Sequence, residues 1–190
     1  AELELTYKFP VKVLPTQPIY LGLEQPERWR IELNGRPVST NAACGWWVDP
    51  AIRRIPLDPT ALVRNRNVLV LRGQFDRLAA LEIVYLLGPF GTDVNKKTGA
   101  VTRLPPKLKL GSWLDQGLAF YGGNVVYRTE VELTKSPGRR YRLRLGKFAA
   151  TAVEVALNGG PGVVCGWPDY ECDITDALTD GRNTVDLRVL

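Results

Sequence analysis

The 190-residue sequence contains no histidine and no methionine. Without histidine there is no Ser-His-Asp or Cys-His nucleophile, no imidazole general base and no histidine-ligated zinc. These absences exclude most common hydrolase and transferase chemistries and leave carboxylates and lysine as candidate catalytic groups. Because the chain begins with Ala1 and contains no methionine, we expect a processed chain or a segment of a longer polypeptide, in which any signal peptide is already absent.

Long apolar runs are also missing. None approaches the roughly 20 residues that cross a bilayer, so we expect no membrane span. The composition, 45% hydrophobic and 24% charged, is that of a globular chain able to build one large domain or two small ones. Cys165 and Cys172 are close enough to bond across a loop, but Cys44 would remain unpaired, which argues against a disulfide framework. The cysteines therefore do not decide whether the chain is secreted, periplasmic or cytoplasmic.

The net charge of +5 is unevenly distributed along the chain. Residues 96–147 hold twelve Lys or Arg against three acids, whereas the segment from residue 150 onward holds two Arg against seven acids. Residues 139–145 alternate charged and apolar side chains, which predicts a strand with one solvated face. A hairpin with residues 126–133 would pair Glu132 with Arg140 and Glu130 with Arg142. We therefore interpret the basic segment as a solvated face and expect no nucleic-acid partner.

Short alternating segments, punctuated by Gly, Pro, Asn and Asp, predict an all-β fold of the sandwich or barrel type. Helical signals are limited to single turns near residues 58–61 and 175–178. The predicted strands are Leu3–Phe9, Ile19–Leu23, Trp29–Leu33, Ile52–Leu57, Val68–Leu71, Leu81–Leu87, Val125–Leu133, Tyr141–Leu145, Ala152–Leu157 and Thr184–Leu190.

An internal repeat organises these segments. Four matches occur in the same order in two parts of the chain, and the Leu-to-Asn spacing is five in both copies. The matches are Leu33-Asn34-Gly35 with Leu157-Asn158-Gly159, Cys44-Gly45-Trp46 with Cys165-Gly166-Trp167, Ala61-Leu62 with Ala177-Leu178, and Arg66-Asn67 with Arg182-Asn183. An ordered series of this kind favours duplication of one β module. We predict two β-sandwich modules, 1–104 and 105–190, with the polar segment 91–100 as their junction or as a long hairpin tip.

The run from Gly111 to Tyr127 (GSWLDQGLAFYGGNVVY) resembles the start of the galactose-binding-like jelly-roll domains of large bacterial glycoside hydrolases. Residues 157–159, 173–178 and 181–185 are similar to the C-terminal half of that domain, and residues 81–91 resemble the segment that joins two such domains. The architecture is that of the accessory regions of the β-galactosidase superfamily and of α-L-rhamnosidase-like enzymes.

The resemblance implies a jelly-roll accessory module whose partners are carbohydrate and the catalytic domain of a parent hydrolase. In this family the catalytic residues lie in a separate α/β barrel, and no acid pair of that barrel matches this chain, so we expect no catalytic residue and no enzyme activity of its own. Calcium binding occurs in galactose-binding-like folds, but the sequence has no ligand spacing that identifies a metal site or another cofactor.

Aromatic side chains in Gly-flanked segments are candidates for stacking on sugar rings, and neighbouring polar groups for contacts to hydroxyls. The candidate carbohydrate-binding residues are Trp113, Tyr121, Trp47, Asp115, Gln116, Asn124, Trp167 and Tyr170. The opposing interpretation is that the aromatic residues, above all Trp46 and Trp167 of the repeat, plug the ends of each sandwich, and that the polar ones cap turns. Trp29 lies inside an alternating strand and is expected in the core.

Asp169 and Glu171 would share one face of a strand, and paired carboxylates can hydrolyse glycosides. No enclosing barrel accompanies them, so we do not favour catalysis. The leading hypothesis is a non-catalytic carbohydrate-binding or scaffold region of a glycoside hydrolase. The alternative is a protein-interaction or adhesion β-sandwich without a sugar ligand, which exposed aromatic residues on a flat sheet face would favour.

Overall fold

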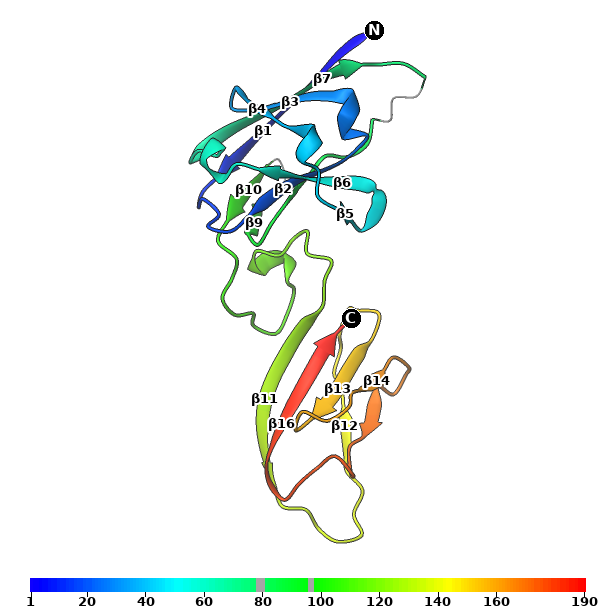
Figure 1. Cartoon of the computed structure of the whole chain (residues 1–190). Helices are drawn as coiled ribbons and strands as arrows, with labels where there is room; N and C mark the ends of the chain where they lie inside the picture. Colours follow the sequence, from blue (N-terminus) through cyan, green and yellow to red (C-terminus); the bar gives the residue numbers. More distant parts are fainter. Residues whose placement is uncertain (78–80, 96–97) are drawn as a thin grey trace. The chain divides into compact units, whose positions relative to one another are not determined.

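The computed structural model describes residues 1–77, 81–95 and 98–190 (Figure 1). The all-β prediction is confirmed: the helical segments within those residues are four 3₁₀ turns, η1 (Pro26–Arg28), η2 (Thr40–Ala42), η3 (Pro59–Ala61) and η4 (Leu114–Gln116). None of the described helices has the length and apolar character needed to cross a membrane. Contacts divide the chain into two compact units, Ala1–Tyr121 and Gly122–Leu190, called here the first and second unit.

Two sheets form the first unit. The larger sheet has the strand order β4 (Arg36–Val38), β3 (Trp29–Leu33), β7 (Asn65–Gln74), β1 (Glu2–Val11), β10 (Gly99–Thr102) and β9 (Gly91–Val94). The smaller sheet has the order β5 (Trp46–Trp47), β6 (Asp49–Leu57), β2 (Ile19–Glu24) and β8 (Tyr85–Leu87). Alternation in β2 and β6 directs Leu21 and Ile55 toward Ile31 and Leu71 of the larger sheet, and all four are at most 2% exposed. Burial of each such side chain contributes about 1.5 to 3 kcal/mol.

The second unit also has two sheets around its own core. The strand orders are β11 (Val125–Leu133), β16 (Gly181–Val189), β13 (Val153–Leu157) and β14 (Val163–Cys165) in one sheet, and β12 (Arg142–Arg144) with β15 (Glu171–Asp173) in the other. A disulfide between Cys165 and Cys172 connects β14 to β15 and so joins the two sheets. Of the alternatives that the cysteine spacing leaves open, the structure has the Cys165–Cys172 bond, and Cys44 is a free, exposed thiol.

Most of the predicted strands correspond to observed ones, but the segment predicted at Leu81–Leu87 is a strand only from Tyr85. The polar segment after residue 90 forms the β9–β10 hairpin, with Gly99 opposite Val94, so of its two interpretations the hairpin is the one observed. Residues 96 and 97 of that segment lie outside the described residues. The two units are compact, but a compact unit need not fold on its own. The boundary predicted at residue 104 between two separate modules therefore stays a prediction.

The predicted hairpin between β11 and β12 is wrong. Strand β11 pairs with β16, which places Glu130 opposite Thr184 and Glu132 opposite Arg182. The chain then crosses to the other sheet, where β12 pairs with β15. The physical reason is burial, because Leu143 of β12 and its neighbours cover the apolar side of the larger sheet only from that position.

A hydrogen-bonded pair of asparagines, Asn34 and the buried Asn67, organises the first unit. Asn67 is 0% exposed, and its Oδ1 accepts hydrogen bonds from Asn34 Nδ2 (2.8 Å) and from the Val63 amide (2.9 Å), while its Nδ2 donates to the Val63 carbonyl (2.8 Å). Asn34 Nδ2 also donates to the Ala61 carbonyl, and its Oδ1 accepts from the Val68 amide. The pair fastens the β3–β4 hairpin to the turn before β7. Because Asn34 and Gly35 both have positive φ, 52° and 77°, this tight hairpin favours an Asn-Gly sequence.

The same bonds recur in the second unit. Asn183 is 0% exposed and accepts from Asn158 Nδ2 and from the Thr179 amide, both at 2.8 Å, and donates to the Thr179 carbonyl. Asn158 bonds the Ala177 carbonyl and the Thr184 amide. The strand order β4-β3-β7-β1 has its counterpart in β14-β13-β16-β11. The registers agree as well: Leu33 faces Leu69 in the first unit, and Leu157 faces Val185 in the second.

We predict that Asn67→Ala and Asn183→Ala each lower the free energy of unfolding by about 2 to 4 kcal/mol, because each leaves buried amide and carbonyl groups without partners. Urea unfolding of the full chain measures the loss, and amide hydrogen exchange assigns it to the unit that carries the substitution. The exposed Asn41 provides the control, since Asn41→Ala is expected to change stability by less than about 0.5 kcal/mol. Equal effects of Asn67→Ala and Asn41→Ala would contradict a structural role for the pair.

Candidate functional site

Trp113 and Tyr121 form an aromatic pair in the first unit. Their ring centroids are 6.3 Å apart and the ring planes are tilted by 60°. Trp113 is half-buried and Tyr121 is 47% exposed. The buried Leu118 lies between them in sequence, and its amide donates to the Trp113 carbonyl, while the Tyr121 amide donates to the Leu118 carbonyl. These bonds hold both rings on one short, tightly turned segment, so the structure brings these two predicted residues together.

The polar candidates near this pair differ in their surroundings. Gln116 Oε1 accepts from the Lys109 amide (2.7 Å), and its Nε2 donates to the Lys109 and Ser112 carbonyls, both at 3.0 Å. Its amide group therefore holds the loop together, as the turn-capping interpretation expects. Asp115 is exposed on η4, and Asn124 is exposed in the second unit.

Trp47 lies on a sheet surface that the sequence interpretation missed. Its ring centroid is 4.8 Å from that of Tyr85, and the Arg54 guanidinium lies 4.6 Å from the ring centroid of Tyr20. Tyr20, Arg54 and Tyr85 alternate with Leu21, Ile55 and Leu86, which belong to or pack against the core, so they share the outer face of the smaller sheet. The period-two pattern could have assigned Tyr20, Arg54 and Tyr85 to the outward faces of their strands, although it does not show that these strands are neighbours.

The two Cys-Gly-Trp tryptophans are solvent-exposed. Trp167 is 82% exposed and Trp46 is 55% exposed, so the interpretation that they plug the sandwich ends is wrong. Tyr170, at 37% exposure, packs its ring edge-on against Phe148 with centroids 4.9 Å apart. Its amide donates to the Trp167 carbonyl in a turn, so Trp167 and Tyr170 are close in the chain while only Tyr170 contacts a second ring. Trp29 packs against the core of the first unit, as expected.

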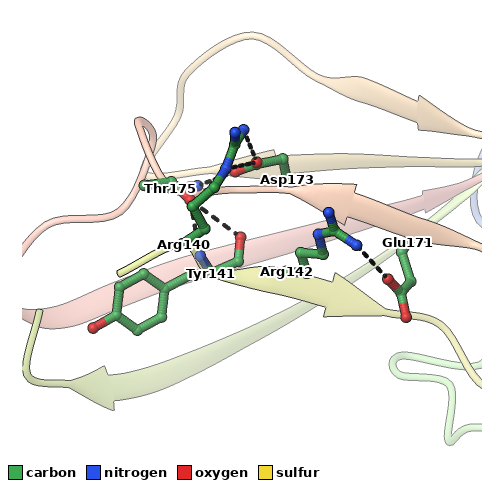
Figure 2. Close-up of polar contacts among 6 residues, drawn as sticks. All are labelled: Arg140, Tyr141, Arg142, Glu171, Asp173 and Thr175. Carbon is green, nitrogen blue, oxygen red and sulfur yellow. Dashed lines mark hydrogen bonds and ion pairs between the residues drawn. The ribbon is translucent and has the colours of Figure 1, made fainter. Parts of the chain in front are cut away.

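Arginines of the basic segment pair with the two acids of β15. Arg140 binds Asp173, with Nε at 2.8 Å from Oδ2 (Figure 2). Arg144 Nε lies 2.6 Å from Glu171 Oε1. Arg142 Nη1 is 3.4 Å from the other Glu171 oxygen. Three arginines of the basic strand therefore pair with acids, and these acids are in β15 rather than being Glu130 and Glu132.

The arginines and a nearby threonine keep both acids ionised. Hydrogen bonds from the Thr175 hydroxyl and amide, and then from Arg140, lower the pKa of Asp173 to about 2. Hydrogen bonding to Arg144 is the main cause that lowers the pKa of Glu171, and Arg142 adds to it. A glycosidase general acid needs a raised pKa, whereas the pKa of Glu171 is lowered, so Glu171 does not have the electrostatics of such an acid.

A hollow of about 670 Å³ lies in the second unit beside these ion pairs. Its walls are the loop between β11 and β12 and the turn after β15. The lining residues are Lys135, Ser136, Pro137, Gly138, Arg139, Arg140, Thr175 and Asp176. Nothing in the sequence interpretation pointed to this hollow, because its two walls are about 35 residues apart in the chain. Within the described ranges, no group of three or more acids and cysteines is arranged to hold a metal ion.

Comparison with known proteins identifies no family. No protein-family model matches the chain, and no curated protein matches it. Among solved structures, a rhamnosidase from Novosphingobium sp. PP1Y aligns over 100% of this chain with 21% identity and a TM-score of 0.36. An α-L-rhamnosidase from Streptomyces avermitilis, solved with L-rhamnose, aligns over 99% with 18% identity and the same TM-score.

The chain spans 17% and 21% of the lengths of those two enzymes, so its alignment covers a small part of each. A TM-score of 0.36 is too low to carry an argument about fold or function. The all-β class therefore rests on the strands themselves, and the galactose-binding-like resemblance stays a prediction.

We predict that the fold loses stability as the pH falls from about 4 to about 2. Because the folded-state pKa of Asp173 is depressed, its carboxylate stabilises the fold above the ordinary aspartate pKa, and this contribution disappears as the group is protonated. Asp173→Asn removes that part of the pH dependence, whereas Asp115→Asn, at an exposed site, leaves it unchanged. Carboxyl NMR titration measures the group directly, and a midpoint near 3.8 would contradict the assignment.

Proposed function

We propose that this chain is a non-catalytic, carbohydrate-recognising or supporting region of a glycoside hydrolase. Carbohydrate binding is supported by one observation, the Trp113–Tyr121 pair. Its ring centroids are 6.3 Å apart, and both rings lie on one hydrogen-bonded segment. The C–H groups of a pyranose pack on aromatic faces, and a pair held before binding loses little conformational entropy when the sugar arrives. The exposed carboxylate of Asp115, two residues after Trp113, supplies an acceptor for sugar hydroxyls.

A non-catalytic role is supported by the electrostatics of the acids. The pair considered for hydrolysis, Asp169 and Glu171, includes one acid held by two arginines, which favours the ionised state throughout the neutral range. Such an acid stabilises the sheet and is a poor proton donor. Any hydrolytic step belongs, in this proposal, to a separate catalytic domain that the two units would support.

The proposal includes duplication of one β module. Equivalent asparagine pairs, equal strand orders and equal registers in the two units support it. The left-handed residues support it too: Asn65 with φ 72° and Gly181 with φ 87° each lie two positions before the buried asparagine. Positive φ is uncommon for a non-glycine residue such as Asn65, so a left-handed residue at the same point of both turns is a useful marker of common geometry.

We predict that isothermal titration of the full chain with neutral mono- and oligosaccharides, galactose among them, gives weak binding that Trp113→Ala and Tyr121→Ala each reduce by about tenfold or more. The loss of a stacked ring has this effect, because about 1.4 kcal/mol corresponds to a factor of ten. Trp46→Ala is the matched control, since it removes an exposed indole from the same unit. Absence of heat at millimolar sugar would leave only the supporting role, and equal losses with Trp46→Ala would contradict the assigned site.

A second candidate function, protein interaction, is favoured by the β5–β6 hairpin. Val48 at its tip is 74% exposed with φ 63°, a strained conformation for a β-branched residue, and Trp46 beside it is also exposed. If this hairpin binds protein, sedimentation velocity at rising concentration would show association that Trp46→Ala reduces and Trp167→Ala does not. A monomer at all concentrations would remove self-association as its role.

A further inference from the structure

The hollow of the second unit has walls that are fixed before any ligand arrives. Lys135 Nζ donates to the Thr175 carbonyl (2.8 Å) and the Leu178 carbonyl (3.1 Å), which ties one wall to the other. The Tyr141 amide donates to Thr175 Oγ1 at 2.8 Å, and the Ser136 amide donates to the Tyr141 hydroxyl at 2.8 Å. These bonds hold the loop between β11 and β12 in one conformation, so its side chains need little ordering on binding.

The cations of the hollow differ in how they are compensated. Arg140 is paired with Asp173, as Figure 2 shows. Lys135 bonds carbonyl oxygens, and Arg139 is exposed; among the residues that the structure describes, neither ion-pairs with a carboxylate. Asp176 on the opposite wall is exposed. Lys135 and Arg139 together with Asp176 leave the hollow with one net positive charge.

The charges and hydrogen-bonding groups of the hollow favour one chemical class of ligand. A carboxylate fits the guanidinium of Arg139, which offers parallel N–H donors, and it also compensates the charge of Lys135. Asp176 opposes a second negative charge but accepts hydrogen bonds from hydroxyls, and the Ser136 side chain can give or accept one. A small monoanion that also carries hydroxyl groups satisfies both walls, whereas a phosphate dianion is repelled by Asp176.

We propose that the hollow between residues 135–140 and 175–176 binds an acidic sugar, a uronate, with its carboxylate on Arg139 and its hydroxyls on Asp176. This site lies in the second unit and does not use Trp113 or Tyr121, so it is independent of the neutral-sugar proposal.

The test is isothermal titration of the full chain with D-glucuronate, D-glucose, acetate and inorganic phosphate as probes. We expect glucuronate to bind most tightly and Arg139→Ala to weaken it by about tenfold or more. Arg64→Ala is the matched control, because it removes an exposed arginine from the first unit and is expected to leave the affinity unchanged. Binding of neutral sugars that Trp113→Ala reduces is expected to survive Arg139→Ala, which separates the two sites.

Asp176→Ala gives the sharpest discrimination, since its expected effects on two probes have opposite signs. It removes both oxygens that accept from sugar hydroxyls and so weakens glucuronate, whereas acetate, which has no hydroxyl, only loses a repelling charge and binds more tightly. Three results would overturn the proposal: glucuronate binding no tighter than acetate, phosphate binding tighter than glucuronate, or equal losses with Arg139→Ala and Arg64→Ala. The Arg139 side chain is exposed, so its removal is not expected to impair folding, and circular dichroism verifies this.

Discussion

The hydrogen-bonded asparagine pair, of which Asn67 and Asn183 are the buried members, is the interaction on which each unit depends. A sharp turn before the central strand leaves an amide and a carbonyl that no neighbouring strand can reach, and one side-chain amide satisfies both. Only asparagine has the required chemistry at this length. Aspartate would lack the donor and would bury a charge, glutamine would be too long, and serine could not bond both groups while accepting from a second asparagine.

With this bond network in place, the remaining loops of the two units differ freely. The spacing from the first asparagine of the pair to cysteine is ten residues in one unit, Asn34 to Cys44, and seven in the other, Asn158 to Cys165. The second unit has the smaller core, and the disulfide between its sheets adds stability that a small core does not supply. The first unit buries more apolar side chains and leaves its cysteine unpaired.

Local sequence pattern predicted which residues form strands and which face the core, as in β2, β3 and β13. It did not predict the partner of each strand, since alternation reports the face of a strand and not its neighbour. Strand β12 is the clearest case: its arginines were expected beside Glu130 and Glu132 of the preceding strand, and they lie beside Glu171 and Asp173. The short strands β5, β14 and β15 have two or three residues each, too few for a visible period.

The sequence predicts which kinds of residue are candidates for binding, but only partly which of them lie close together in the fold. Trp113 and Tyr121 were identified together because a turn of a few residues separates them, whereas Tyr85 reaches Trp47 only through the pairing of four strands. The hollow was missed for the same reason, since its cations and Asp176 come from distant segments.

The Cys-Gly-Trp match shows that equal sequence need not mean equal role. Cys165 is buried in a disulfide while Cys44 is an exposed thiol, and both tryptophans that follow are exposed. The match therefore has no shared core function that would explain it, in contrast to Asn67 and Asn183, which make the same three hydrogen bonds to the partner asparagine and to the backbone of the turn. Structural constraint at these turns is carried by the buried Asn67 and Asn183, whereas the exposed aromatic and basic residues considered for binding lie on other segments.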